Sequence, residues 1–384
     1  MSEKTAVKFS QRTTSPFRYD VVGSFLRPES LKQAREQFAA NEINAVELKA
    51  VEDQAIIELL RNEEKAGLKA VTDGEFRRSW WHLDFFWGLQ GVEKTALNNG
   101  YVFHDEETRA ESARLTGQLS GANHPFVEHF KFTLAHANDD VVVKQTIPAP
   151  AQFLAELQRP ENLSATQAQY PTDDELIEGI AAAYHQVILD LYKAGCRNVQ
   201  LDDCTWGMLV SHHDGARPGD ETPAEEKLAI LKQQYVTVNN KAIADLPADL
   251  TVNTHICRGN YHSTWASAGG YETVADPLFN QENVSAYFLE YDSERAGGFE
   301  PLKKVSTDKL VVLGLVTSKT GELEAPQTII DRIHEAGKYV PLDRLCLSTQ
   351  CGFASTEEGN ILTEEQQWAK IALVKDVANQ VWGA

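Results

Sequence analysis

The sequence lacks any long apolar run. No stretch of about 18 consecutive apolar residues occurs in the chain, so we expect no membrane-spanning helix and no membrane partner. The N-terminal residues Met1–Thr14 are polar and mixed in charge, without the apolar segment of a secretory signal, which predicts a cytoplasmic protein. The chain also lacks an internal repeat, a linker or a low-complexity tract, so we expect residues 1–384 to form a single domain.

Positive charge and cysteine are both scarce. Lys and Arg number 36 against 56 Asp and Glu, a formal net charge of −20, and this balance repels phosphate backbones, so nucleic acid is not an expected partner. An odd count of five cysteines without a secretory signal argues against a disulfide framework. We expect Cys196, Cys204 and Cys346 in the core, and we consider Cys257 and Cys351 as candidate metal ligands.

Short β-branched segments alternate with longer helical ones. Eight segments have the composition of strands: Tyr19–Ser24, Ala70–Glu75, Asp140–Ile147, Asn198–Asp203, Asp249–Cys257, Val284–Glu290, Lys309–Val316 and Leu345–Gln350. Helical periodicity is found at Asn44–Leu68, Asp174–Ala194, Pro223–Ile243, Ala325–Ala336 and Glu364–Trp382. This order predicts an α/β fold, a (β/α)8 TIM barrel, with an insertion after the second strand at approximately residues 80–138. An open doubly wound sheet is the alternative, but no G-x-G-x-x-G follows the first strand.

Polar residues fall at the C-terminal ends of these predicted strands: Ser24, Asp73, Glu75, Asp202, Asp203, His255, Cys257, Glu290 and Cys351. A barrel gathers these ends on one face, where enzymes of this fold carry their active sites. Residues two apart in a strand point to the same side, so His255 and Cys257 share a direction. With Glu290 and Cys351 they offer one nitrogen, one oxygen and two sulfur ligands, which suits tetrahedral zinc. Burial as structural residues is the alternative.

A zinc site dispersed over three strands on this face differs from the close ligand pairs of purely structural sites. A thiol substrate bound to such a metal would lose its proton and become a nucleophilic thiolate. Other residues leave two interpretations open. Asp202 and Asp203 could hold a substrate amino group, or cap helices. Arg77 and Arg78 could bind an anion or lie at the surface. The aromatic residues Trp80, Trp81, Phe85, Phe86 and Trp87 could stack a planar heterocycle or pack in a core, and we expect His212, His213 and Asp214 in a solvated loop.

Several motifs occur in order along nearly the whole chain: V-G-S-F-L-R-P (Val22–Pro28), D-G-E (Asp73–Glu75), Q-L-D-D (Gln200–Asp203), T-H-I-C (Thr254–Cys257), L-E-Y-D-S (Leu289–Ser293) and L-S-T-Q-C-G (Leu347–Gly352). In these motifs the chain resembles the cobalamin-independent methionine synthases, specifically their catalytic C-terminal barrel and the short single-barrel branch. The resemblance implies Zn2+ as the cofactor, held by the same four residues, His255, Cys257, Glu290 and Cys351.

The resemblance also implies the reaction. Zinc-activated homocysteine would take a methyl group from 5-methyltetrahydrofolate or another donor, giving methionine. Gly23 and Ser24 would bind the carboxylate of homocysteine, and Glu75 with Asp202 its amino group. Full-length members carry a second barrel of similar size, which this sequence does not contain. They also have a histidine after the seventh strand, proposed as general acid; Val316–Glu324 contains none, so the sequence assigns no catalytic acid.

Two alternative functions follow from the same residues. Single-barrel relatives alkylate other thiols, for example by opening an epoxide, so a different acceptor thiol is one alternative. A non-catalytic metal-binding or thiol-sensing barrel is the other, although it needs fewer polar strand ends than this sequence has. The oligomeric state is left open, and a homo-oligomer is compatible with the sequence.

Overall fold

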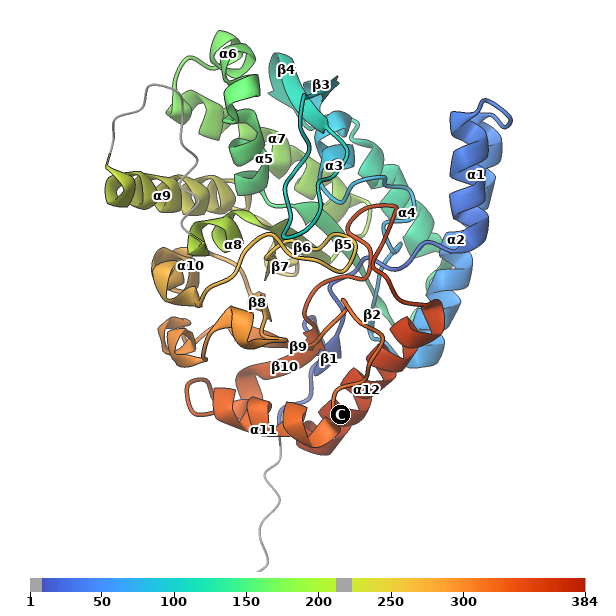
Figure 1. The fold of residues 1–384 in the computed structure, drawn as a ribbon, viewed down its shortest axis with the longest axis vertical. Helices are drawn as coiled ribbons and strands as arrows, with labels where there is room; N and C mark the ends of the chain where they lie inside the picture. Colours follow the sequence, from blue (N-terminus) through green and yellow to red (C-terminus); the bar gives the residue numbers. More distant parts are fainter. Residues whose placement is uncertain (1–8, 212–222, 384) are drawn as a thin grey trace, which may run out of the picture.

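The fold is a nearly closed barrel of eight parallel strands. A computed structural model describes residues 9–211 and 223–383, and the residues His212, His213 and Asp214 considered above lie outside this part. The strand order is β1-β10-β9-β8-β7-β6-β5-β2, and Figure 1 shows the strands at the centre with helices around them. The strands are β1 (Tyr19–Asp20), β2 (Ala70–Val71), β5 (Val142–Pro148), β6 (Asn198–Asp203), β7 (Thr251–Ile256), β8 (Ala286–Glu290), β9 (Leu310–Val316) and β10 (Leu345–Thr349). The predicted (β/α)8 fold is confirmed.

The first two strands are shorter than the sequence predicts. Both end before a residue with positive φ, Gly23 at 139° and Gly74 at 64°, a backbone conformation that leaves the strand ladder. Their loops nevertheless join the two ends of the sheet. The Phe25 amide donates to the Gly74 carbonyl at 3.2 Å, and the Thr72 hydroxyl donates to the Gly23 carbonyl at 2.6 Å. In both cases, the residues that the sequence predicts as the end of the strand form a loop instead, and the two loops are hydrogen-bonded to each other at the rim of the barrel.

The helices surround the sheet and bury apolar faces against it. Their bounds are α1 (Glu29–Ala39), α2 (Ala45–Ala66), α3 (Leu83–Gly88), α4 (Pro125–His136), α5 (Pro150–Leu157), α6 (Pro160–Gln169), α7 (Asp173–Lys193), α8 (Thr205–Val210), α9 (Ala224–Ala242), α10 (Ala275–Gln281), α11 (Pro326–Ala336) and α12 (Glu364–Trp382). The five predicted helices correspond to α2, α7, α9, α11 and α12. The α2 helix starts at an Asn44 capping box and ends at Gly67, whose φ is 86°. In the described part of the chain, no helix is long and apolar enough to cross a membrane.

The segment between β2 and β5 is the largest departure from the strand–helix repeat. It contains α3, an antiparallel hairpin of β3 (Gln90–Ala96) and β4 (Glu111–Ser120), and then α4. Because α4 packs against α2, α7 and β5, it occupies the place of a barrel helix. The hairpin packs on α5, α6 and α7. The insertion therefore consists of α3 and the hairpin.

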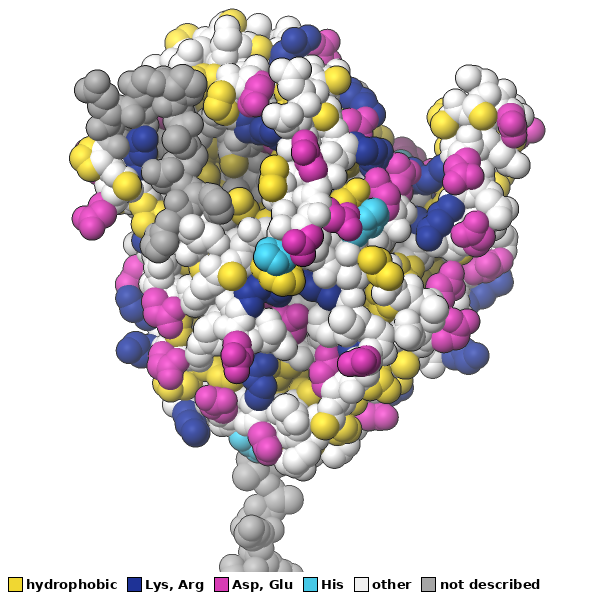
Figure 2. Space-filling view, viewed as in Figure 1, with side chains coloured by type: hydrophobic (Ala, Val, Ile, Leu, Met, Phe, Trp, Pro, Cys, Tyr) yellow, Lys and Arg dark blue, Asp and Glu magenta, His cyan; other side chains and the backbone are white. Residues whose placement is uncertain are grey.

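The connection between β3 and β4 reaches the mouth of the barrel. The His104 ring stacks on Trp265 at a centroid distance of 4.6 Å, and Phe103 contacts Tyr261 at 5.5 Å. His262 Nδ1 lies 2.7 Å from Glu106 Oε2. The hairpin loop is thus fastened to the loop after β7, over the C-terminal ends of the strands. On the face shown in Figure 2, acidic and basic side chains are interspersed.

Candidate active site

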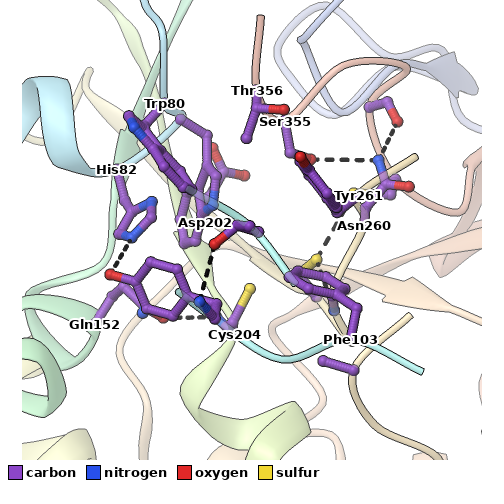
Figure 3. Close-up of a pocket in the computed structure, with 18 of the residues that line it drawn as sticks. Trp80, His82, Phe103, Gln152, Asp202, Cys204, Asn260, Tyr261, Ser355 and Thr356 are labelled. Atoms are coloured by element: carbon purple, nitrogen blue, oxygen red, sulfur yellow. Dashed lines mark hydrogen bonds between the residues drawn. The ribbon is translucent and has the colours of Figure 1, made fainter. Parts of the chain in front are cut away.

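A cavity of about 380 Å³ opens at the C-terminal ends of the strands. Its wall includes side chains from the ends of five segments of the barrel: Ser24, Glu75, Asp202, His255, Cys257 and Cys351. In Figure 3, Asp202 and Cys204 lie between an aromatic side with Trp80 and His82 and an opposite side with Asn260 and Tyr261. The barrel therefore brings predicted site residues from distant parts of the sequence into one cavity.

His255, Cys257, Glu290 and Cys351 form a buried cluster whose potential ligand atoms all lie within 4.8 Å of one another. The Cys257 and Cys351 sulfur atoms are 3.7 Å apart. His255 Nδ1 faces the Phe288 carbonyl at 3.3 Å, while Nε2 has no hydrogen-bond partner among the described residues. A histidine that donates from one ring nitrogen presents the lone pair of the other, which is how metal-binding histidines are oriented. The cluster could hold a metal ion.

Neighbouring groups also orient the Glu290 carboxylate and the Cys257 sulfur. Glu290 Oε1 accepts the Arg258 amide at 3.0 Å, and Oε2 lies 3.3 Å from the Arg295 guanidinium. The Gly259 amide donates to the Cys257 sulfur at 3.4 Å. These contacts orient the carboxylate and the thiolate within the cluster.

The pKa shifts within the cluster favour binding of a cation. Hydrogen bonds from Cys204 and then Cys351 hold the pKa of the Cys257 thiol well below its usual value. The same contact with Cys257 raises the pKa of Cys351, and burial raises that of Glu290 to about 7. Burial and the neighbouring Cys257 thus oppose the ionisation of Cys351 and Glu290, and a divalent cation bound in the cluster would favour the ionised form of both.

The predicted acceptor residues lie beside this cluster. Glu75 Oε1 accepts the Thr146 hydroxyl at 3.0 Å and lies 3.3 Å from Arg78, whereas its Oε2 has no partner among the described residues. Asp202 Oδ1 accepts the Gln200 amide at 2.8 Å, and burial raises the pKa of Asp202 to about 7. Two carboxylates therefore present oxygen atoms to the cavity near the His255–Cys257–Glu290–Cys351 cluster.

Of the two residues predicted to bind the substrate carboxylate, Ser24 lies in the adjoining wall, whereas Gly23 is not among the residues that line the cavity. Ser24 lines the cavity, and its hydroxyl accepts the Ala354 amide at 3.3 Å. Gly23 lies behind it with a φ of 139°, and a Cβ atom there would approach Thr146 Cγ2 to 2.8 Å. Glycine is therefore needed for this backbone to pack against β5.

Several residues that the sequence left ambiguous do not face the cavity. Asp203 accepts the backbone amide of Thr205, the first residue of α8, at 2.8 Å. Arg77 pairs with Glu52 at 3.1 Å. Phe85 and Phe86 are fully buried in the core.

The prediction for Cys204 is wrong, whereas Cys196 and Cys346 are buried as predicted. Cys204 is half-buried and lines the cavity. Because β6 ends at Asp203, Cys204 is the first residue beyond the strand, on the barrel face that holds the His255–Cys257–Glu290–Cys351 cluster.

Sequence reasoning missed part of the cavity wall. His82, Tyr101, Phe103 and Tyr261 line it, together with Trp80 and Trp81. The aromatic density at residues 80–87 was a usable signal for Trp80 and Trp81. Tyr101 and Phe103 belong to the hairpin loop, and no sequence pattern indicates that this loop reaches the barrel mouth.

The fold and this site together define the class of protein. It is a (β/α)8 barrel with an enzyme-like cavity at the C-terminal ends of its strands and a buried cluster that could hold a metal ion. The chain belongs to the family of the cobalamin-independent synthase catalytic domain, whose model matches residues 17–379. The family supports a methyltransferase-type enzyme with a methionine synthase-like catalytic domain.

Similar proteins cover the same length. The uncharacterized protein YxjG of Bacillus subtilis is 46% identical over 392 residues, covering all of both chains. The crystal structure of a putative vitamin-B12 independent methionine synthase from Listeria monocytogenes has a TM-score of 0.75 and 36% identity, covering 97% of this chain and 100% of that one. The structure of a B12-independent methionine synthase from Shewanella in complex with selenomethionine has a TM-score of 0.69 and 20% identity, covering 95% and 97%.

Proposed function

We propose that this chain is a single catalytic barrel that transfers a methyl group to the thiol of homocysteine in a zinc-dependent reaction, giving methionine. The observation that carries the proposal is the buried His255–Cys257–Glu290–Cys351 cluster in the same cavity as the Glu75 and Asp202 carboxylates. The selenomethionine bound by the Shewanella relative supports an amino acid of this size and shape as the product.

The donor set fits zinc. His255 would bind through Nε2, Cys257 and Cys351 through their sulfur atoms, and Glu290 through a carboxylate oxygen, which are the ligand types of tetrahedral zinc. Zinc bound there would lower the pKa of a substrate thiol and keep the sulfur as a thiolate at neutral pH. Two of the proposed ligands are already oriented by hydrogen bonds: His255 by the Phe288 carbonyl and Glu290 by the backbone amide of Arg258.

The remaining chemistry is positioning by the protein's own groups. Glu75 Oε2, which is buried and without a partner in the described structure, would accept the substrate ammonium together with Asp202. The ammonium would in turn favour the ionised form of Asp202, opposing the effect of burial. Ser24 would donate to the substrate carboxylate. The thiolate sulfur forms a bond to the methyl carbon, and the bonding pair of the methyl group leaves with the donor.

The loop after β9, where the resemblance predicts a histidine as general acid, contains Lys319 and no histidine. Lys319 in this loop donates to the Gly259 carbonyl, Asn260 Oδ1 and the Thr264 carbonyl at 3.3, 2.8 and 2.9 Å. These three bonds occupy its ammonium group and fasten the loops after β7 and β9 together. We therefore assign Lys319 to positioning these loops.

The decisive experiment is methionine formation, measured by mass spectrometry with homocysteine, 5-methyltetrahydrofolate triglutamate and zinc. We expect turnover that a chelator abolishes and added zinc restores. If zinc-loaded protein binds homocysteine but forms no methionine, 5-methyltetrahydrofolate is the wrong donor. If homocysteine does not bind either, methionine formation is the wrong function, and a thiol without an amino acid group becomes the acceptor to test.

A further inference from the structure

A group of side chains on the aromatic side of the cavity has no part in the proposed acceptor site. Its centre is His82, which precedes α3, lines the cavity and is 3% exposed. The His82 ring lies 4.6 Å from the Trp81 ring, 5.8 Å from Trp80 and 5.4 Å from Tyr101. Phe86 lies 5.6 Å from it as well, so four aromatic rings fix the position of this imidazole.

Hydrogen bonds also fix which nitrogen of His82 carries the proton. Tyr101 donates its hydroxyl proton to Glu156 Oε2 at 2.8 Å, because a carboxylate can only accept. His82 Nε2 lies 3.1 Å from the same Tyr101 oxygen and must therefore donate to it; Figure 3 shows this contact. The proton of the neutral ring is on Nε2, and Nδ1 carries a lone pair.

That lone pair has no partner within the described part of the protein. Leaving a buried polar atom unpaired is costly, so such an atom in a residue that lines a cavity points to a ligand. His255 Nε2 and Glu75 Oε2 are in the same condition, and the proposed function fills both, with metal and with substrate ammonium. The proposed function assigns no partner to His82 Nδ1. Burial lowers the pKa of His82 to about 3, so the ring is a neutral acceptor at working pH.

We propose that His82 is a binding residue for the alkyl donor, and that its Nδ1 accepts a hydrogen bond from an N–H or O–H group of a flat donor molecule lying against Trp80 and Trp81. This inference rests on the proposed function, since it concerns the second substrate of the same cavity. It assigns the donor to a chemical class: a ring system with a hydrogen-bond donor on its edge. A carboxylate-bearing sulfonium without N–H or O–H would leave Nδ1 unpaired.

Tyr101 and Glu156 act through His82 and are positioning residues. Glu156 is 2% exposed and accepts the Ser112 hydroxyl as well as that of Tyr101, with Arg159 3.6 Å away. This buried anchor holds Tyr101, and Tyr101 holds the imidazole. Tyr101→Phe should therefore weaken donor binding less than the loss of His82 does, because the lone pair remains while its orientation loosens.

The test compares binding and turnover in matched variants. Zinc-loaded wild type, His82→Phe and His82→Gln are titrated calorimetrically with 5-methyltetrahydrofolate and, separately, with homocysteine. We expect His82→Phe to raise the Kd and the KM of the folate at least tenfold while zinc content and the Kd of homocysteine stay unchanged. His82→Gln keeps a neutral acceptor and should recover part of the affinity. Exposed His334, replaced by Phe, is the control.

The outcomes separate this inference from the proposed function. Equal folate affinity in His82→Phe and wild type would overturn the role of His82. So would a wild-type protein that binds no folate, or that takes its methyl group from dimethylsulfoniopropionate. Weakened folate binding in His82→Phe without methionine formation by the wild type would support His82 and overturn the proposed reaction.

Discussion

At the scale of single residues, Cys351 is one of two cysteines in the buried His255–Cys257–Glu290–Cys351 cluster, and the proposed function makes it a zinc ligand. Replacing it with Ser removes a soft ligand, so we expect zinc affinity to fall at least tenfold and methionine formation to fall in parallel. Zinc per chain after dialysis against a competing chelator is the measurement. Cys346→Ala, in the barrel interior and 0% exposed, is the control and should keep its zinc. A Cys351→Ser protein that still holds one zinc per chain would remove Cys351 from the ligand set.

Asp202 tests the acceptor assignment at the same scale. Asp202→Asn removes the charge that would pair with a substrate ammonium, and hydrogen bonds to charged groups contribute about 1.5–3 kcal/mol. We therefore expect the KM of homocysteine to rise about tenfold or more. Steady-state kinetics with varied homocysteine gives the result, with exposed Asp139→Asn as the matched control. An unchanged KM would show that the acceptor lacks an amino group near Asp202.

At the scale of elements, a buried carboxyl links α9 to the segment after α10. Glu282 Oε1 accepts the Asn239 side-chain amide at 2.7 Å, and burial raises the pKa of Glu282 to about 8. The folded state then binds a proton that the unfolded state has lost above its ordinary carboxyl pKa. The stability from this group is therefore present at low pH and is lost as pH rises through about 8.

Glu282→Gln should remove that dependence. Between pH 5 and 8, as approximate limits, we expect the free energy of unfolding of wild type to fall relative to the variant by up to about 1.4 kcal/mol per pH unit. Urea unfolding of the metal-free proteins across this range makes the comparison, and subtracting the variant cancels the other buried carboxyls, such as Glu290. Parallel curves for the two proteins would contradict the assignment.

At the scale of the whole molecule, a buried ion pair ties β1 to β5 inside the barrel. Lys144 Nζ lies 2.7 Å from Asp20 Oδ1, and both side chains are 0% exposed. Lys144→Met leaves Asp20 buried without its cation, which should cost about 3–5 kcal/mol. The exposed pair Lys69–Asp140, at 3.3 Å, is the control, because Lys69→Met should cost about 0–1 kcal/mol. Chemical denaturation of both variants measures the difference, and equal losses would contradict the role of the buried pair.

The sequence by itself determined the repeating architecture, and it predicted the four residues that the fold gathers in one buried cluster. Strand and helix periods are local, so the central strands could be placed to within a few residues. The separation of His255 from Cys257 by two positions is also local and gives both side chains one direction. Motif order then linked Glu290 and Cys351 to them, because parallel strands of a barrel end on a common face.

Only the tertiary structure decided which other groups reach that face. Cys204 is in the cavity because β6 stops one residue earlier, and His82 has its proton on Nε2 because Tyr101 from the hairpin loop bonds to Glu156 from α5. The first two strands end early because Gly23 and Gly74 adopt positive φ in loops that bond to each other across the rim. Such contacts join residues far apart in sequence, and their geometry depends on the packing of loops that have no periodicity of their own.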